Sequence, residues 1–194
     1  MNASDGKRLL ARWIEEGSFA GKLPEVAGLR GVQQADEYHG EGDAFIHTML
    51  AVEAVADDAD QRVFWGVLLH DIGKALTTGF IRGRWRSHGH GEAGAKLVPE
   101  IMSRVGLPDL AMDVAWLVRH HDFLLSWNLK PEFRLTAGQR RFTELPLFPL
   151  LLQVSAADAA ASWGGSRKGE DGRRLGELLA LEASQIDRLK DEDR

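Results

Sequence analysis

The residues best suited to chemistry in this chain are its histidines and a few isolated carboxylates. All seven histidines lie between His39 and His121, and the segment after His121 contains none. The chain has no cysteine, which excludes disulfides, thiol catalysis and zinc sites built on thiolates. A metal site must therefore use imidazole nitrogens and carboxylate oxygens, which suit Ni, Mn, Co, Fe or Zn, with Mg as a further candidate. The clustered histidines predict one or two divalent ions.

His70 and Asp71 are the strongest candidates for metal ligands. Adjacent side chains on a helix point about 100° apart, so both can face one ion only where the helix ends. Gly73 predicts that end, because glycine readily takes the left-handed cap conformation. His70 also continues the apolar stripe of Val63 and Val67 and should face the core. An isolated buried aspartate beside it would be costly unless it is paired or coordinating.

Two further candidates lie in apolar surroundings. Asp158 has apolar or small neighbours on nearly every side of its expected helix, between Leu151 and Ala161. A buried unpaired carboxylate is unfavourable, so Asp158 should ligate a metal, form a salt bridge to an arginine, or lie near a helix end. His121 continues the apolar stripe of the helix expected before it, whereas His120 points elsewhere. Either of these two histidines could be a ligand.

The remaining histidines leave alternatives open. His88 and His90 flank Gly89 just before an expected helix, where a flexible backbone lets one or both rings turn inward. His47 lies on a helical face with small neighbours, which leaves room for an ion. Any one of these histidines alone could equally be a surface residue or a hydrogen-bonded core residue.

The spacing of apolar residues predicts an all-α protein. Helices are expected over residues 4–17, 44–56, 60–70, 91–105, 108–121, 134–142, 145–162 and 174–190. The segments 17–42, 75–89 and 164–172 are rich in glycine and polar residues and are predicted to connect these helices. No segment shows the alternation expected of a strand.

Length and composition indicate a folded globular protein. The 194 residues fit one domain. The net charge of -5 and pI near 5.8 give no general attraction to nucleic acid or anionic lipid, so any polyanion must meet a local basic patch. The N-terminal residues lack the apolar core of a signal peptide. The most apolar stretch, 145–163, contains Pro146, Pro149 and Asp158 and is a poor membrane span. These features predict a cytoplasmic protein without membrane partners.

Several motifs occur in an order that resembles one family. They are YHGEGD at Tyr38–Asp43, LLHDIGK at Leu68–Lys74, HGHGEAGA at His88–Ala95, His121-Asp122 and Ala157-Asp158. Together they are similar to the HD domain at the C-terminal end of bacterial CCA-adding tRNA nucleotidyltransferases. The resemblance covers residues from about 23 to 163 and implies a single-domain helical bundle of the HD type over 1–194. The glycine-serine loop and paired carboxylates of that family's nucleotide-adding half have no counterpart here, so CCA addition is not implied.

The resemblance also implies roles for individual residues. The HD superfamily's metal ligands fall on His47, His70, Asp71 and Asp158. Members with two ions add histidines that would be His90 and one of His120 or His121, with Asp71 bridging the ions. The motif's lysine is Lys74, which would meet a substrate phosphate. Independently of the resemblance, His88, His120 and Arg86 are further candidates for substrate binding.

These roles predict a metal-dependent phosphohydrolase. Asp71 and Lys74 would be its catalytic residues, and metal-activated water would cleave a phosphomonoester or a 2',3'-cyclic phosphodiester of a nucleotide or RNA end. The expected partner is a small phosphorylated substrate such as a nucleotide, with tRNA or another RNA end as an alternative. Two other functions remain open: a non-catalytic, metal-stabilised module that binds nucleotide or tRNA, and a di-iron oxygenase on the same scaffold.

Overall fold

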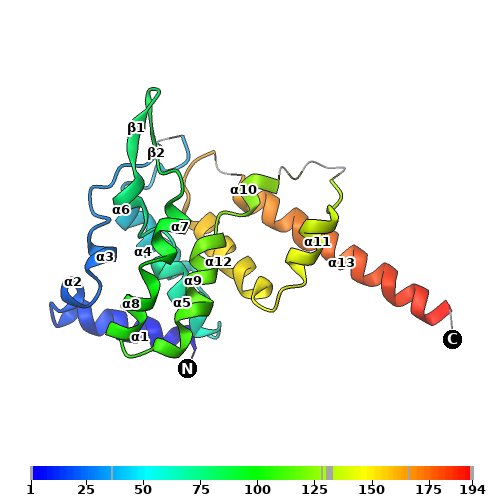
Figure 1. Ribbon diagram of the computed structural model, residues 1–194, viewed down its shortest axis with the longest axis horizontal. Helices are drawn as coiled ribbons and strands as arrows, with labels where there is room; N and C mark the ends of the chain where they lie inside the picture. Colours follow the sequence, from blue (N-terminus) through cyan, green and yellow to red (C-terminus); the bar gives the residue numbers. More distant parts are fainter. Residues whose placement is uncertain (1, 36, 128, 130–132, 166, 193–194) are drawn as a thin grey trace.

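The computed structural model describes residues 2–35, 37–127, 129, 133–165 and 167–192, with side chains as far as residue 181. This part of the chain is a bundle of helices with one small hairpin (Figure 1), which confirms the all-α prediction. The helices are α1 Ala3–Glu15, α2 Phe19–Lys22, α3 Pro24–Ala27, α4 Ala44–Ala54, α5 Gln61–Leu69, α6 Lys74–Thr77, α7 His90–Ala95, α8 Val98–Arg104, the 3-10 helix η1 Pro108–Leu110, α9 Ala111–His120, α10 Leu124–Trp127, α11 Ala137–Thr143, α12 Phe148–Ala161 and α13 Lys168–Glu192. The strands are β1 Gly79–Ile81 and β2 Arg84–Arg86.

Helix α5 is the centre of the bundle. All of its residues from Val63 to Leu69 are buried, and it packs against α1, α4, α9 and α12. A Cβ atom at Gly66 would lie 3.1 Å from Cγ2 of Val154 and 3.3 Å from Cβ of Leu117. Glycine at this position therefore lets α5 approach α9 and α12 together. The end of this central helix is consequently surrounded by other helices rather than by solvent.

The first helix starts earlier than its sequence suggests. The side chain of Asn2, rather than Ser4, accepts a hydrogen bond from the backbone of Asp5, whose own side chain accepts one from the backbone of Asn2. This reciprocal pair satisfies two backbone donors that the helix itself cannot satisfy. Helix α1 ends at Glu15, before Gly17 adopts a positive φ of 69°. The expected range of 4–17 is therefore displaced toward the N-terminus.

Three other expected elements differ in the structure. Residues 91–105 form two helices, α7 and α8, because Pro99 lies in the first turn of α8 and cannot donate a helical hydrogen bond. The connecting segment 17–42 contains the short helices α2 and α3. The final helix begins at Lys168, within the segment 164–172 that was expected to be a loop. Its two glycines at 169 and 172 disfavour helix, but tertiary contacts of the first turn outweigh that local preference.

The segment 75–89 was expected to be a loop but contains the hairpin of β1 and β2. The pairing runs from Gly79 opposite Arg86 to Ile81 opposite Arg84. The two turn residues, Arg82 and Gly83, have positive φ values of 52° and 79°, as a two-residue type I′ turn requires. Strands of only three residues are too short to produce a recognisable alternation, so the sequence pattern could not reveal them.

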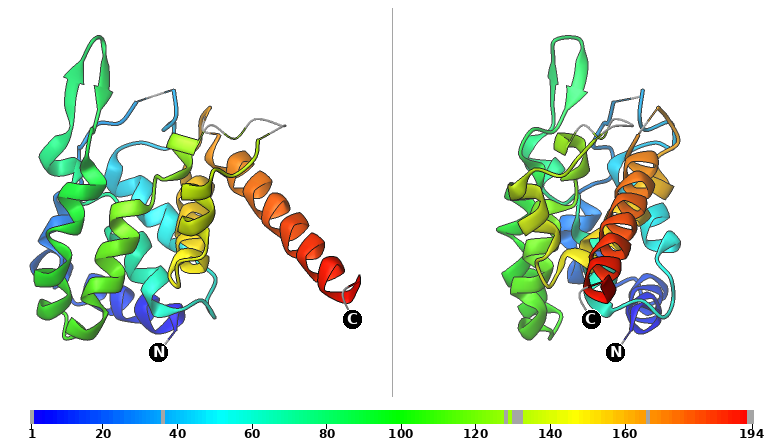
Figure 2. Two further views of the ribbon diagram at one scale, coloured as in Figure 1. Left: turned by 45° about the vertical axis from the view of Figure 1, so that its right-hand side comes forward. Right: turned by 90° about the vertical axis from the view of Figure 1, so that its right-hand side faces the viewer.

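Helix α13 leaves the bundle. It starts beside α12, and Figure 1 and the left view of Figure 2 show its far end pointing away from the other helices. No helix within the described ranges has the length and apolar character that crossing a membrane requires. The expectation of one domain over residues 1–194 stays a prediction.

Candidate metal centre

Six side chains predicted to bind metal converge at the end of α5. They come from α4 (His47), the end of α5 (His70 and Asp71), the first residue of α7 (His90), the end of α9 (His121) and α12 (Asp158). All are buried except His90, which is half-buried. The structure therefore brings together polar groups separated by up to 111 residues in sequence.

The two carboxylate oxygens of Asp71 face different histidines. Oδ1 lies 3.4 Å from Nε2 of His90 and 3.9 Å from Nε2 of His121. Oδ2 lies 3.2 Å from Nε2 of His70 and 3.9 Å from Nε2 of His47. Asp71 is thus shared between two nitrogen pairs, an arrangement that fits a carboxylate bridging two cations.

Asp158 completes one half of this cluster. Its Oδ1 lies 3.0 Å from Nε2 of His47 and 3.9 Å from Nε2 of His70. Its Oδ2 lies 2.6 Å from Nζ of Lys168, at the start of α13. One oxygen of Asp158 therefore faces the histidines and the other forms an ion pair. The salt bridge considered for this aspartate exists, but its partner is a lysine rather than an arginine.

Backbone carbonyls fix the tautomers of three rings. Nδ1 of His70 lies 2.6 Å from the Val67 oxygen, and Nδ1 of His121 lies 2.7 Å from the Val118 oxygen. Nδ1 of His90 is held in the same way, 2.8 Å from the carbonyl oxygen of Ser87. A carbonyl can only accept, so each Nδ1 donates, and a neutral ring then presents an Nε2 lone pair to the cluster.

These lone pairs fit a cation. Nε2 of His90 lies 3.0 Å from Nε2 of His121, so two neutral rings in these tautomers point their lone pairs at each other. Nε2 of His70 is buried and has no hydrogen-bond partner among the described residues. Unsatisfied buried acceptors are costly. Divalent ions coordinated by these atoms would remove that cost, so the donor set fits a metal centre.

A carboxylate that the sequence analysis missed holds His47 in place. Oε1 of Glu41 lies 2.7 Å from Nδ1 of His47 and 2.7 Å from Nδ1 of His39. Burial alone would raise the pKa of Glu41, but hydrogen bonds from His47, from the Trp163 amide and from His39 lower it to about 2. An ionised Glu41 fixes the His47 ring with Nε2 toward the cluster, as carboxylates do behind metal-binding histidines.

The protonation of the cluster agrees with this geometry. Burial would lower the pKa of His47, but its hydrogen bonds to Asp158 and Glu41 raise it to about 9. Burial, together with the neighbouring His90 and His70, lowers the pKa of His121 to about 3. Without a cation, a proton occupies the place on His47 that a metal would take, whereas His121 is neutral and able to ligate.

Two lysines line the same centre. Nζ of Lys74 lies 2.7 Å from Oδ2 of Asp71 and donates to Oε1 of Gln34 at 2.6 Å. Lys168 pairs with Asp158, and this neighbouring carboxylate outweighs the effect of burial and raises the lysine pKa. Lys74 was predicted from its motif. Lys168 and Gln34 were not, because neither lies in a motif that the sequence analysis singled out.

Asp71 and His90 of this centre line a cleft of about 740 Å³. His88 and Arg86 line this cleft, as do both lysines. His120 does not: its ring centroid lies 4.7 Å from that of Trp116, and the residue borders a separate hollow of about 400 Å³. The structure thus places His121 rather than His120 beside Asp71.

Gly73 contributes through close packing. It was expected to take the left-handed conformation, but its φ is -68°, so this expectation was wrong. A Cβ atom there would lie 2.0 Å from the carbonyl oxygen of His90. Glycine is therefore needed because the backbones of the Asp71 and His90 segments meet at this point.

Helices converging on a shared aspartate with buried histidines define this molecule as a helical metal-binding protein of the histidine-aspartate class. The HD domain family matches residues 42–163, which is more than half of the 194 residues. The chain therefore belongs to the HD domain family, within the superfamily of metal-dependent phosphohydrolases.

Similar proteins share one description. A "Multifunctional CCA protein" of Halorhodospira halophila is 40% identical over 113 residues, which are 58% of this chain and 27% of that protein. Its counterpart in Psychromonas ingrahamii is 32% identical over 152 residues, or 75% of this chain and 36% of the relative. That of Alkalilimnicola ehrlichii is 40% identical over 109 residues, 55% of this chain and 26% of the relative. The chain thus spans 26% to 36% of the length of these curated relatives.

Proposed function

We propose that this chain hydrolyses a phosphate ester of a nucleotide or an RNA end, either a phosphomonoester or a 2',3'-cyclic phosphodiester. The observation that carries the proposal is the position of Asp71, whose two oxygens each face a pair of imidazole nitrogens. A centre for two cations beside a cleft is typical of enzymes that cleave phosphate esters.

The ligand assignment follows the two oxygens of Asp71. His47, His70, Asp71 and Asp158 would hold one ion, and Asp71, His90 and His121 would hold the second. When bound, such ions activate water and offset the negative charge that develops on phosphoryl oxygens. Imidazole and carboxylate donors favour Ni, Mn, Co, Fe or Zn over Mg.

The chain's own cations would orient the phosphate. Lys74 and Lys168, which line the cleft, place their ammonium groups against Asp71 and Asp158. Gln34 holds Nζ of Lys74 from behind. A phosphoryl group entering the cleft would meet both ammonium groups, which act as charge-assisted donors to its oxygens. His88 and Arg86 would contact the substrate higher on the cleft wall.

The printed name of the relatives, "Multifunctional CCA protein", supports an RNA end as the substrate. By analogy, the phosphate ester of this chain's substrate would belong to tRNA, another RNA end or a small nucleotide, and the reaction would take place in the cytoplasm. A non-catalytic nucleotide-binding role and an oxygen-using di-iron role use the same donor set, so the experiment must separate them.

The test combines metal analysis of the purified protein with a screen of phosphomonoesters and 2',3'-cyclic nucleotides in Ni, Mn, Co and Mg. We expect metal-dependent turnover that is lost in Asp71→Asn and His70→Ala, each with native circular dichroism. Asp57→Asn, at an exposed carboxylate paired with Lys7, should keep full activity. Tight nucleotide binding without turnover under any metal would support the binding module instead, and oxygen uptake that depends on ferrous iron would support the oxygenase.

A further inference from the structure

Arg86, at the end of strand β2, has no ion-pair partner among the residues that the structure describes. It is half-buried and lines the same cleft as Asp71 and His90 of the metal centre. Its Nε atom is buried and has no acceptor within the described part of the chain. A buried donor without an acceptor is costly and uncommon in proteins. The ordinary partner of such a guanidinium is an anion, and phosphate matches its planar donor geometry.

The hairpin holds Arg86 in a defined place relative to the metal centre. Arg86 is followed by Ser87, whose carbonyl oxygen accepts from Nδ1 of His90 at 2.8 Å. The hairpin turn is tight, and the rings of Trp85 and Phe80 pack at 5.2 Å on the opposite face from Arg86. Arg86 therefore lies on a paired strand rather than on an unpaired loop, next to the residue whose carbonyl holds His90.

Further cations border the same part of the cleft. Arg84 shares the strand face of Arg86, and its partner Glu37 is 3.3 Å away with both side chains largely exposed. Arg167, the residue before α13, also lines the cleft and is 3.5 Å from Asp171 in an ion pair whose arginine side chain is exposed. Exposed ion pairs are weak, so Arg84 can turn to a ligand at little cost. The protein as a whole carries a net charge of -5, so these arginines form a local positively charged region on an acidic protein.

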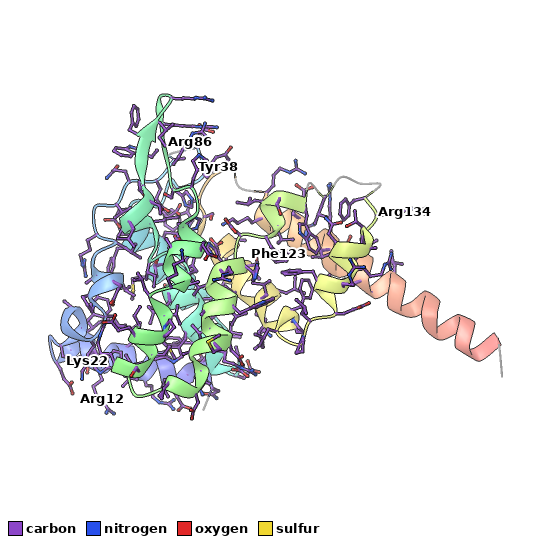
Figure 3. All side chains as sticks on the ribbon, in the orientation of Figure 1. Arg12, Lys22, Tyr38, Arg86, Phe123 and Arg134 are labelled. Carbon is purple, nitrogen blue, oxygen red and sulfur yellow. The ribbon has the colours of Figure 1, made fainter. Side chains whose placement is uncertain are left out.

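An aromatic ring lies beside these arginines. Tyr38 is 42% exposed and lines the cleft. Arg86 lines the same cleft, and in the view of Figure 3 both labelled residues lie near the hairpin. An exposed ring next to guanidinium groups is the combination that binds single-stranded nucleic acid, through base stacking and phosphate contacts.

We propose that Arg86 forms a second phosphate subsite and that the cleft takes the phosphate-bearing end of a single-stranded oligonucleotide. This inference rests on the proposed phosphohydrolase function. The terminal phosphate would lie at the metal centre, the next phosphate along the strand at Arg86, and a base against Tyr38. Arg84 and Arg167 would serve phosphates further along. A mononucleotide fills only the position at the metals and leaves Arg86 without a partner.

The test compares two substrates on one protein preparation: a tetranucleotide and a mononucleotide that carry the same terminal phosphate. Wild-type kcat/KM should favour the tetranucleotide by about tenfold or more, the size of a charge-assisted contact. Arg86→Gln should lose most of that preference, and Arg86→Lys should keep part of it. Each protein is judged by the ratio of its kcat/KM values for the two substrates, so differences in metal loading between the variants cancel. The matched control is Arg82→Gln, which removes the same charge at the hairpin turn outside the cleft and should keep the ratio.

A binding measurement separates this subsite from the hydrolytic function. The logarithm of the affinity for a fluorescent RNA tetranucleotide without a terminal phosphate should fall with the logarithm of salt concentration. Arg86→Gln should reduce this slope by about 0.7, the effect of one lost phosphate contact on a single strand. Equal wild-type kcat/KM for both substrates, or equal losses in Arg86→Gln and Arg82→Gln, would overturn the subsite. If neither substrate is hydrolysed with any metal, the proposed function fails, and the salt slopes alone decide the subsite.

Discussion

Lys168 places its Nζ atom 2.6 Å from Oδ2 of Asp158, so the first residue of the last helix is tied to the metal centre. The other oxygen of Asp158 lies 3.0 Å from Nε2 of His47. The lysine thereby fixes which carboxylate oxygen faces the histidines. It also provides a cation that can neutralise this buried aspartate in the absence of metal.

Replacing this lysine should destabilise the metal-free protein more than the metal-loaded protein. Lys168→Met leaves Asp158 buried without its ammonium partner, and loss of one partner of a buried pair costs about 3 to 5 kcal/mol. A bound divalent ion would take over much of the neutralisation. Urea denaturation with and without metal measures the difference. Lys96→Met, at a pair 3.7 Å apart with both side chains largely exposed, should change stability by less than about 1 kcal/mol. Equal destabilisation in both states would contradict the role given to Lys168.

The stability of the metal-free protein should fall as pH rises from about 6.5 to about 9. Hydrogen bonds to Asp158 and Glu41 outweigh burial and raise the pKa of His47 from 6.5 to about 9 in the folded state. A raised pKa stabilises the fold fully below the unfolded value, and this contribution, about 3 kcal/mol, is lost as pH passes through the folded value. Thermal unfolding across this pH range tests the prediction.

The proton on Nε2 of His47 should also affect metal binding. A metal that binds Nε2 of His47 must displace the proton held there, so metal binding near pH 7 should release protons and strengthen as pH rises. Calorimetry in buffers of different ionisation enthalpy measures this release. A flat stability profile in the metal-free protein, together with no proton release, would show that His47 is already neutral.

Gly73→Ala should destabilise the fold at the centre itself. The added Cβ would lie 2.0 Å from the carbonyl oxygen of His90, which is backbone and cannot turn aside. Displacement of the segment would cost about 1 to 3 kcal/mol or more and should weaken metal binding as well. Gly176→Ala is the control, because a Cβ there has no neighbour within 4 Å and alanine favours helix by about 1 kcal/mol. Equal denaturation midpoints for the two variants would contradict the close approach.

Much of the fold could be predicted because helical periodicity is a local property of sequence. The hairpin could not, since its two three-residue strands are too short for an alternating pattern. Pro99 marks the break between α7 and α8, whereas the spacing of apolar residues over 91–105 predicted one helix. The start of α13 could not be predicted, because the glycines in its first turns disfavour helix. Lys168 is held there by its ion pair with Asp158, a contact that no local pattern encodes.

The candidate site was predictable to the extent that polar residues stood out against apolar neighbours. His70, Asp71 and Asp158 were recognisable in this way, and the structure brings them together. The choice between His120 and His121 depended on where α9 ends, which periodicity locates only to within a turn. Glu41 lies within the Tyr38–Asp43 motif, but the sequence alone did not show that this carboxylate orients the His47 ring.

In the function proposed for this chain, the carboxylate of Asp71 serves two cations. Crystals grown with manganese, with data collected at the manganese absorption edge, test this role most directly. We predict two anomalous peaks on opposite sides of the Asp71 carboxylate, one among His47, His70 and Asp158, the other beside His90 and His121. Peaks absent from the neighbourhood of Asp71, or ions bound only elsewhere on the protein, would contradict it.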